Sequence, residues 1–475
     1  MPRNFSFTTG YGALLIVSVL LVYGLLHLGQ SWFPPLGVSD VQTTAVGRES
    51  WWAALQTNLR EPISLLLMQI VVIIVVARAC GRAFARLGQP AVVGEIIAGI
   101  LLGPSALGWL WPELMHFLFP PEALGSLKLL SMLGVMLFMF VVGMDLDLQE
   151  LRQRAKVAVV VSHVSIAFPF LLGVLLSFAL FTTLAPAGIP FMAFSLFTGI
   201  AMSITAFPVL ARIIHERGLA GTTLGHHAIA CAAVDDVSAW CLLALVIALV
   251  KSGSFSGAIA TLLLTAGLIA FMLLWVRPRA DALLDTHLSR KRDGNGGAVF
   301  ASMLVLMFAS ALAAELIGIH AIFGAFLAGV ALSARAELRS MIRERLETFS
   351  SAFLLPLFFA FTGLRTQFAL LHDWQSWLLC AGIILVAIAG KLGGSTLAAR
   401  WAGMRWREAS ALGVLMNTRG LMELVVLNIG YDLGVISARM FAMLVLMALV
   451  TTFMTGPLVG WLLRPPASAA RPRAG

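Results

Sequence analysis

The chain has 475 residues, of which 60% are hydrophobic and only 12% are charged, and its mean hydropathy is +0.94. Soluble globular domains are about 45–50% apolar and about 25% charged, so this composition excludes an ordinary soluble protein and indicates a polytopic membrane protein in a lipid bilayer. The net charge of +9 does not indicate nucleic-acid binding, because the basic residues lie in short loops between apolar segments.

Apolar segments long enough to span a membrane follow one another along almost the whole chain. The first of them follows Arg3 and is not followed by a small-residue cleavage site, which favours an uncleaved anchor over a signal peptide. An all-α fold of about fourteen transmembrane helices is predicted, near residues 11–28, 61–86, 90–107, 127–145, 156–184, 190–216, 222–250, 255–276, 299–317, 318–335, 348–366, 376–402, 406–431 and 436–464.

The distribution of lysine and arginine predicts the orientation of these helices. Basic residues gather after the fourth, eighth, tenth and twelfth predicted helices, around Arg152, Arg290, Arg339 and Arg405. All four loops follow even-numbered helices, so they lie on one side, which we expect to be the cytoplasm. The prediction is therefore a multi-pass protein of the inner (plasma) membrane with both termini in the cytoplasm.

Two pairs of segments resemble each other in the same order. Val93–Leu102 is similar to Phe323–Leu332, and Leu137–Met144 is similar to Leu357–Leu364. The matching helices are seven apart, an odd number, so the two halves insert in opposite orientations, as in many secondary transporters. The alternative is chance similarity between apolar segments, but two matches in the same order are explained better by an internal repeat.

The predicted domains follow from these segments. They are an N-terminal anchor with an external loop (1–60, the loop around Ser31–Arg60), a membrane domain (61–464) made of two six-helix repeats (61–250 and 299–464) joined by a linker helix (255–276), and a short cytoplasmic tail (465–475).

One helix in each half contains a break. In the first half it falls at Ser203–Pro208, where Pro208 removes a helical hydrogen bond and clashes with the preceding turn. In the second half it falls at the polar cluster Asn417–Leu421. An isolated proline kink is common in membrane helices, but breaks at corresponding places in both halves indicate an ion site. Freed carbonyl groups and Thr205 are candidate cation ligands.

Adjacent carboxylates, Asp235 and Asp236, lie about 14 residues into a predicted helix, which is about 20 Å deep and near the bilayer centre. Acids at this depth are costly and are usually functional. Two neighbouring carboxylates cannot both be ionised freely, so they are expected to titrate as a coupled pair that holds protons or a cation. Lys391, near the middle of its own helix, is the predicted partner of one of them; the alternative is a lysine that reaches to the membrane surface.

Other intramembrane polar residues allow two interpretations each. Glu95 either faces a cytoplasmic funnel or pairs with an arginine. Arg419 and Glu423 are spaced i,i+4 on the broken helix and either support the site or satisfy each other. His320, beside a short external turn, fits an interfacial position as well as a functional one. The predicted supporting residues of the ion site are Lys391, Ser203, Pro208, Asn417, Arg419, Glu423 and Glu95.

Several function classes have no motif in this sequence. There is no G-x-x-x-x-G-K-[ST] loop for nucleotide phosphates, which argues against transport driven by ATP. There is no H-E-x-x-H motif, Cys/His cluster or grouped nucleophile, which argues against a membrane enzyme and predicts no cofactor.

The sequence resembles the second branch of the monovalent cation:proton antiporters, most of all the plant-type cation/proton exchangers and their bacterial relatives. The resemblance covers about residues 61–464. The motifs that carry it are Pro90–Pro104, Thr205–Arg212, the Asp235–Asp236 pair, His320–Gly329, Leu355–Phe359, Gly390–Lys391 and Leu415–Leu424.

This resemblance implies a thirteen-helix antiporter core with one additional N-terminal helix, in which a dimer-forming panel packs against a mobile six-helix core with two crossed broken helices. It implies that Asp236 binds the alkali cation and exchanges the proton, that Asp235 pairs with Lys391, and that Thr205 lies beside the site. An Asp-Asp pair, where plant relatives usually have asparagine first, implies electrogenic exchange.

The expected function is therefore antiport of Na⁺ or K⁺ against protons by alternating access, in a homodimer. The alternative is a cation-coupled symporter of an organic anion on a related fold. That alternative requires a roomy polar cavity with cationic anchors near both breaks, and Arg419 is the one obvious candidate in the sequence.

Overall fold

The computed structural model describes residues 16–18, 20–25, 27–28, 51–145, 155–252, 255–280, 296–333, 339–340 and 343–463. Within these ranges the chain forms helices and turns and no strand, which confirms the predicted all-α class. The predicted tail, residues 31–50 of the predicted external loop, and much of the basic loops around Arg152, Arg290 and Arg335 lie outside the described residues.

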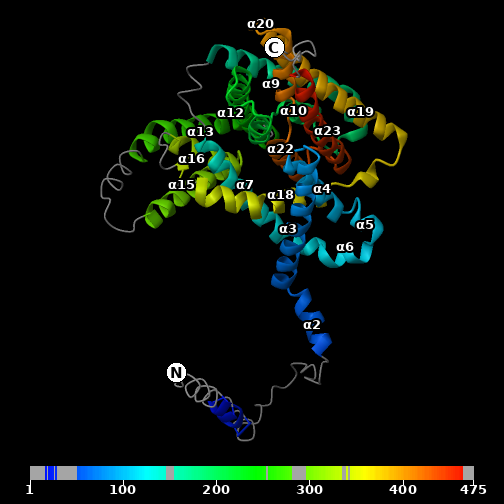
Figure 1. Ribbon diagram of the computed structural model, residues 1–475, viewed down its shortest axis with the longest axis vertical. Coiled ribbons are helices and arrows are strands. Elements are labelled where there is room, and N and C mark those ends of the chain that lie inside the picture. The colour runs from blue at the N-terminus through cyan, green and yellow to red at the C-terminus, as the bar shows by residue number, and fades with distance from the viewer. Residues whose placement is uncertain are drawn as a thin grey trace, which may run out of the picture. The chain divides into compact units, whose positions relative to one another are not determined.

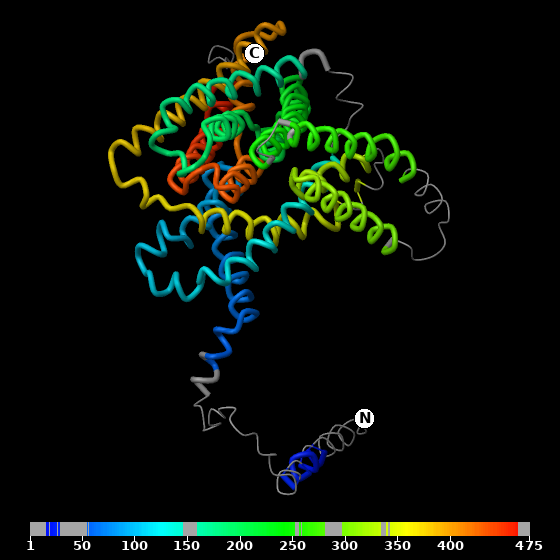
Figure 2. The backbone as a smooth tube through the Cα atoms, turned by 180° about the vertical axis from the view of Figure 1, so that it is seen from behind, coloured from blue at the N-terminus to red at the C-terminus, as the bar shows by residue number. Residues whose placement is uncertain are grey.

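Figures 1 and 2 show the arrangement of the helices. They are α2 (Trp51–Arg60), α3 (Pro62–Arg86), α4 (Ala91–Leu102), α5 (Leu107–Leu110), α6 (Pro112–Leu118), η1 (Pro121–Ala123), α7 (Leu124–Met144), α9 (Ala155–Leu184), α10 (Phe191–Ser203), α11 (Phe207–Glu216), α12 (Thr223–Ser252), α13 (Phe255–Ala270), η2 (Phe271–Val276), α15 (Gly296–Ile317), α16 (Ala321–Leu332), η3 (Arg343–Glu347), η4 (Ser350–Leu354), α18 (Leu355–Leu364), η5 (Phe368–Leu370), α19 (Trp374–Ile388), η6 (Ala389–Gly393), α20 (Gly394–Trp401), α21 (Trp406–Met416), α22 (Leu421–Asp432) and α23 (Ala438–Leu462).

The chain divides into two compact units, Met1–Glu61 and Pro62–Gly475. The first unit contains an apolar helix at Ile16–Leu25 and the helix α2. Within the predicted external loop, residues 51–60 form the helix α2. Its sequence, WWAALQTNLR, separates apolar from polar residues at helical spacing, which is the pattern of an amphipathic helix.

Among the described residues, eleven helical segments are long and apolar enough to cross a membrane, or twelve if α21 and α22 are counted as one bent span. The remaining two predicted spans correspond to shorter apolar helices, Ile16–Leu25 and Ala321–Leu332. Fewer than fourteen of the described helices are therefore long enough to span a membrane. A 12-residue helix such as α16 is only about 18 Å long, which is shorter than the hydrocarbon core of about 30 Å.

The two predicted breaks divide helices as expected. Residues 190–216 form α10 and α11, separated by extended residues at 204–206. Pro208 is in the first turn of α11, where its missing N–H group costs no helical hydrogen bond. Residues 406–431 form α21 and α22, whose axes differ by 43°. Both breaks leave helix ends in the interior of the second unit.

Four helices, α4, α7, α16 and α18, pack so closely that their backbones touch, and we call them the panel helices. A Cβ atom on Gly99 of α4 would lie 2.6 Å from the carbonyl oxygen of Phe359 in α18. A Cβ atom on Gly143 of α7 would lie 2.2 Å from the carbonyl oxygen of Phe326 in α16. Small residues permit this close approach in membrane proteins, where helix association depends on packing.

The glycine contacts follow the internal similarity of the sequence. The segment containing Gly99 resembles the segment containing Gly329, and the segment containing Gly143 resembles the one containing Gly363. In the structure Gly99 lies against Gly363, and Gly143 lies against Gly329. Each contact thus joins one helix from each half of the chain, as a two-fold relation between the halves requires.

A Gly363→Ala variant tests this packing. Its Cβ would lie 2.2 Å from the carbonyl carbon of Gly99, so the two backbones must separate, and we expect the free energy of unfolding to fall by about 2 kcal/mol. The measurement is the thermal unfolding of the purified protein in detergent. Gly382→Ala in α19 is the matched control, because no heavy atom lies within 4 Å of a Cβ at that position. Equal stability of the two variants would contradict the proposed role of the contact.

Candidate functional site

Helix α12 places Asp235 and Asp236 in the interior, where both side chains are 0% exposed. The carboxylate of Asp235 has three partners from different segments of the chain. Ser162 of α9 donates to Oδ1 at 3.0 Å, Thr205 from the first break donates to Oδ2 at 2.5 Å, and Lys391 lies 2.7 Å from the same oxygen. Asp235 is thus held in an ion pair with additional hydrogen bonds, the arrangement that a buried charge requires.

Lys391 lies in η6, a single π-helical turn between α19 and α20, and is 0% exposed. Its Nζ also donates to the carbonyl oxygens of Ser165 at 2.9 Å and Ser203 at 2.5 Å. The three donors of the ammonium group therefore all have acceptors. This burial rules out the alternative of a lysine that extends to the membrane surface, and π-helical turns of this kind are frequent at functional sites.

The C-terminal end of α10 leaves four carbonyl groups without helical partners, as every helix end does. Ile200 accepts a hydrogen bond from the Ser203 hydroxyl at 2.9 Å, and Ser203 accepts one from Lys391. Ala201 accepts from Nη1 of Arg419 at 2.6 Å, and Met202 accepts from Nη2 of the same guanidinium. Two cations therefore lie at the negative end of the helix dipole, where positive charge is favoured.

Arg419 and Glu423 pair within the second broken helix at 2.8 Å, and both side chains are 0% exposed. The pair is more than a local i,i+4 contact, because the Arg419 guanidinium also binds two carbonyls of α10. Its backbone is fixed too: the Arg419 N–H donates to Thr452 of α23 at 3.0 Å, and the Thr452 hydroxyl lies 2.7 Å from the Arg419 carbonyl oxygen. Arg419 therefore ties the two breaks together.

The two breaks also meet through their backbones. The N–H group of Ala206 donates to the carbonyl oxygen of Thr418 at 3.0 Å, and the Thr205 hydroxyl lies 3.0 Å from the carbonyl oxygen of Met416. The Thr205 hydroxyl carries one proton, so it donates either to Met416 or to Asp235. The extended residues of the first break thus cross those of the second break beside α12.

Asp236 differs from Asp235 in having no hydrogen-bond partner for either carboxylate oxygen in the part of the chain that the structure describes. The N–H group of Phe207, at the N-terminal end of α11, lies beside it without a hydrogen bond of normal geometry. A helix N-terminus favours negative charge. Asp236 is thus a buried acid with two available oxygens, positioned at the crossing of the breaks.

The charges of this cluster do not cancel. Lys391 and Arg419 are opposed by Asp235, Asp236 and Glu423, and all five side chains are 0% exposed. Two cations against three acids leave one negative charge when every group is ionised. Isolated charge is expensive inside a protein, so the cluster needs one more positive charge. A proton or a monovalent cation each supplies one.

The remaining predicted site residues lie at different distances from this cluster. Asn417 ends α21 with a buried side-chain oxygen that has no partner among the described residues. Glu95 is 8% exposed on α4, within electrostatic range of Arg78 and Arg212, and forms no ion pair with a described residue. The structure thus supports neither the arginine pair proposed for Glu95 nor direct contact with the aspartates.

Three residues of the site were not predicted: Ser162, Ser165 and Thr452. Each is a hydroxyl-bearing residue on an apolar helix, and such residues often bond only to their own backbone, as Ser177 does to Gly173. The i,i+3 spacing of Ser162 and Ser165 on α9 places both on one helix face, but Ser165 contributes its backbone carbonyl, and its hydroxyl has no partner among the described residues. The residue types alone do not indicate which distant groups this face contacts.

Known proteins with similar sequences are cation/proton antiporters. The family model described as "Sodium/hydrogen exchanger, transmembrane" matches residues 70–464. The Na⁺/H⁺ antiporter NhaS4 of Synechocystis sp. is 47% identical over 396 residues, which cover 83% of this chain and 96% of that protein. The cation/H⁺ antiporter 20 of Arabidopsis thaliana is 39% identical over 91% of this chain, which spans about half (52%) of that longer protein.

A solved structure shows the same fold. The sodium proton antiporter MjNhaP1 of Methanocaldococcus jannaschii superimposes with a TM-score of 0.62 over 84% of this chain and 98% of its own, at 15% identity. Together with the family match and the relatives, this places the described helices in a known transporter architecture. The chain therefore belongs to the sodium/hydrogen exchanger family, whose members are transporters and not enzymes.

Proposed function

We propose that this protein exchanges a monovalent cation, Na⁺ or K⁺, for protons across the membrane, with Asp236 as the group that binds both in turn. The observation that carries the proposal is the unpartnered, fully buried carboxylate of Asp236 within a cluster that lacks one positive charge. Because a proton and a cation compete for the same charge, binding of one favours release of the other. This competition is the requirement for antiport.

Asp235 and Lys391 supply a second route for a proton. If only Asp236 changed its occupant, one proton would exchange for one cation and no net charge would move. Opening of the 2.7 Å pair between Lys391 and Asp235 would let a second proton bind or leave during the cycle. We therefore propose electrogenic exchange, with more protons than cations moved.

The membrane context and assembly belong to the same proposal. We place the protein in the inner membrane with its termini in the cytoplasm, on the basis of the lysine and arginine distribution. We divide the membrane domain into two repeats, 61–250 and 299–464, joined by the helix at 255–276, on the basis of the paired glycine contacts. We propose a homodimer because the chain resembles the monovalent cation:proton antiporters, for which this resemblance implies a dimer-forming panel.

The experiment is cation-induced proton movement in proteoliposomes, screened with Na⁺, K⁺ and Li⁺. We expect at least one of these cations to drive proton movement. We also expect the rate to change with an imposed membrane potential, because moving one charge through 100 mV is worth about 2.3 kcal/mol. Exchange that is indifferent to the potential would contradict electrogenicity but not antiport. Folded protein that responds to none of the three cations would contradict the proposal itself.

The rival function, cation-coupled uptake of an organic anion, has no support in the site. It needs a free cationic anchor, and the guanidinium of Arg419 is already bound to Glu423 and to the carbonyls of Ala201 and Met202. The named relatives are cation/proton antiporters.

A further inference from the structure

The panel helices meet α22 and α23 along an interface that contains two cavities, and we call this interface the seam. The first cavity lies between α7, α16, α18 and the outer part of α22, and is lined by Lys128, Ser131, Met132, Val135, His320, Ile322, Phe358, Phe361, Val425, Asn428, Ile429 and Asp432. The second lies between α4, α22 and α23, and Arg419 is one of its lining residues. The two cavities therefore follow one another along α22: Leu424 lines the second cavity and the next residue, Val425, lines the first.

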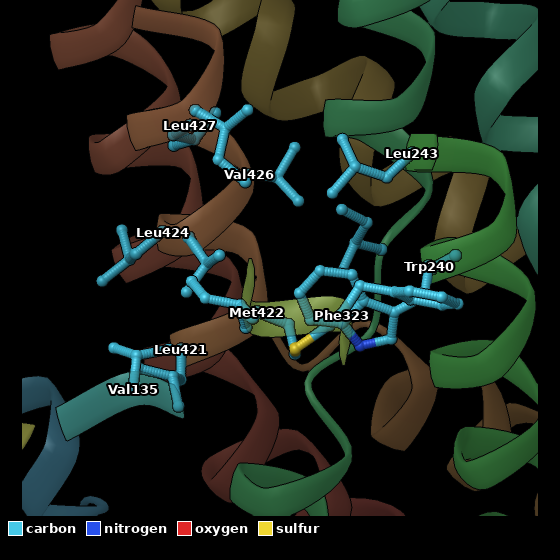
Figure 3. Packing of buried hydrophobic residues seen from close by; sticks show 14 of the residues in the cluster. Val135, Trp240, Leu243, Phe323, Leu421, Met422, Leu424, Val426 and Leu427 are labelled. Carbon is cyan, nitrogen blue, oxygen red and sulfur yellow. The ribbon is translucent and has the colours of Figure 1, made fainter. Parts of the chain in front are cut away.

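Elsewhere the seam is apolar and packed through side chains. Figure 3 shows Leu421, Met422 and Leu424 of α22 in the same cluster as Phe323 of α16. These contacts contrast with the backbone contacts inside the panel, where glycines leave no space for sliding. Relative movement is thus easier at the seam than within the panel.

The first cavity has a polar end and an apolar end. The polar lining residues all lie near helix ends: Lys128 and Ser131 near the start of α7, His320 just before α16, and Asn428 and Asp432 near the end of α22. One or two turns further in, the lining consists of residues such as Val135, Phe358 and Val425. Val425 lies only five residues after Gly420, where the second break ends. A polar mouth that leads through an apolar constriction is a common form of ion gate.

Asp432 joins the elements around the polar end of the first cavity. Its two oxygens pair with Lys128 of α7 at 2.9 Å and with Arg365, which follows α18, at 2.5 Å. Arg365 also donates to Asn428 at 2.8 Å, and Asn428 donates to Thr362 at 2.9 Å. Every ion pair between described residues that joins the panel to α22 or α23 ends on Asp432.

The other end of the seam has no such closure among the described residues. Glu95 of α4 lies near Arg212 of α11, but Arg212 pairs with Glu216 on its own helix at 2.8 Å. The seam is therefore fastened by charge at one end only. By the lysine and arginine distribution, the fastened end faces the outside and the other end faces the cytoplasm.

We propose that the first cavity is the outer half of the ion pathway, and that Asp432, held by Lys128 and Arg365, is the gate that closes it in this conformation. Hydrated monovalent cations and protons would enter between α7, α18 and α22 when Asp432 releases its two partners. This inference rests on the proposed antiport function, because exchange by alternating access needs an outer gate that opens and closes. Loss of the gate shifts the protein toward the outward-open state.

Thiol accessibility tests the gate without requiring transport. Ser131, whose hydroxyl bonds only to Leu127 of its own helix, is changed to cysteine in a background that lacks the native cysteines (Cys80, Cys231, Cys241 and Cys380). Intact cells are treated with a membrane-impermeant maleimide. We expect Asp432→Asn to raise the labelling rate of Ser131→Cys about two- to tenfold, because it removes two partly exposed ion pairs. Lys128→Gln, which removes one pair, should give a smaller increase.

The matched control is Glu408→Gln, which removes the ion pair between Glu408 and Arg405. This pair lies at the N-terminal end of α21, away from the seam. Its labelling rate should equal that of the parent. Equal labelling in Asp432→Asn and in the parent, with both proteins monodisperse and similarly heat-stable, would overturn the gate. Parallel proteoliposome assays separate the two claims: cation/proton exchange in the parent with unchanged labelling in Asp432→Asn rejects the gate alone, whereas absence of exchange in the parent rejects the antiport function.

Discussion

An Asp236→Asn variant is expected to lose cation-driven proton movement completely, down to the level of protein-free liposomes. Asparagine has nearly the same shape as aspartate, but its side chain neither ionises nor binds a transported proton. In the variant, Lys391 and Arg419 are balanced by Asp235 and Glu423, so the cluster no longer needs an additional positive charge. The cation and the proton therefore both lose the group for which they compete.

The measurement is proton movement after addition of Na⁺, K⁺ or Li⁺ to proteoliposomes of the variant and of the parent. Asp373→Asn is the matched control: Asp373 is a carboxylate at the N-cap of α19, outside the site, and asparagine caps a helix about as well. We expect near-normal exchange in the control. Exchange that persists in Asp236→Asn would assign the transported charge to another residue.

A Lys391→Met variant is expected to lower the free energy of unfolding by about 3–5 kcal/mol, because removing one member of a buried ion pair leaves the other charge uncompensated. Asp235 would retain only the hydroxyl partners Ser162 and Thr205, and the carbonyls of Ser165 and Ser203 would lose their donor. Methionine keeps most of the volume of lysine, so lost packing contributes little. The measurement is thermal unfolding in detergent.

The double variant Lys391→Met with Asp235→Asn separates charge from packing. It removes both charges of the pair, and we expect it to recover much of the stability lost in the single variant. Arg405→Gln serves as a surface control, because Arg405 and Glu408 are partly exposed to solvent and such pairs contribute little. A double variant as unstable as Lys391→Met would show that the ammonium acts mainly through the carbonyls of Ser165 and Ser203.

Local sequence signals were sufficient to predict the two breaks. Pro208 and the polar run from Asn417 to Gly420 disturb the helix within a few residues, and such effects do not depend on the rest of the fold. The depth of Asp235 and Asp236 follows from counting residues along one helix. These features could therefore be predicted from short windows of sequence.

Contacts between distant segments could not be predicted from such windows. Lys391 and Asp235 are 156 residues apart, and the carbonyls of Ala201 and Met202 are more than 200 residues from Arg419. A backbone carbonyl has no residue type that marks it as the partner of a cation. The resemblance to antiporters indicated Lys391 as the partner of Asp235, but the binding of Arg419 to α10 required the three-dimensional structure.

The complete use of the carbonyl groups at the end of α10 has a consequence for ion selectivity. Channels that discriminate between alkali ions by coordination use rings of backbone carbonyls in place of the hydration shell. Here Lys391, Arg419 and the Ser203 hydroxyl already occupy all four terminal carbonyls of α10. These four carbonyls are therefore not available to a transported ion, which would be recognised instead by oxygens such as those of the Asp236 carboxylate. Such a site compares ions by charge density and cost of dehydration, and not by their fit to a cage of fixed diameter.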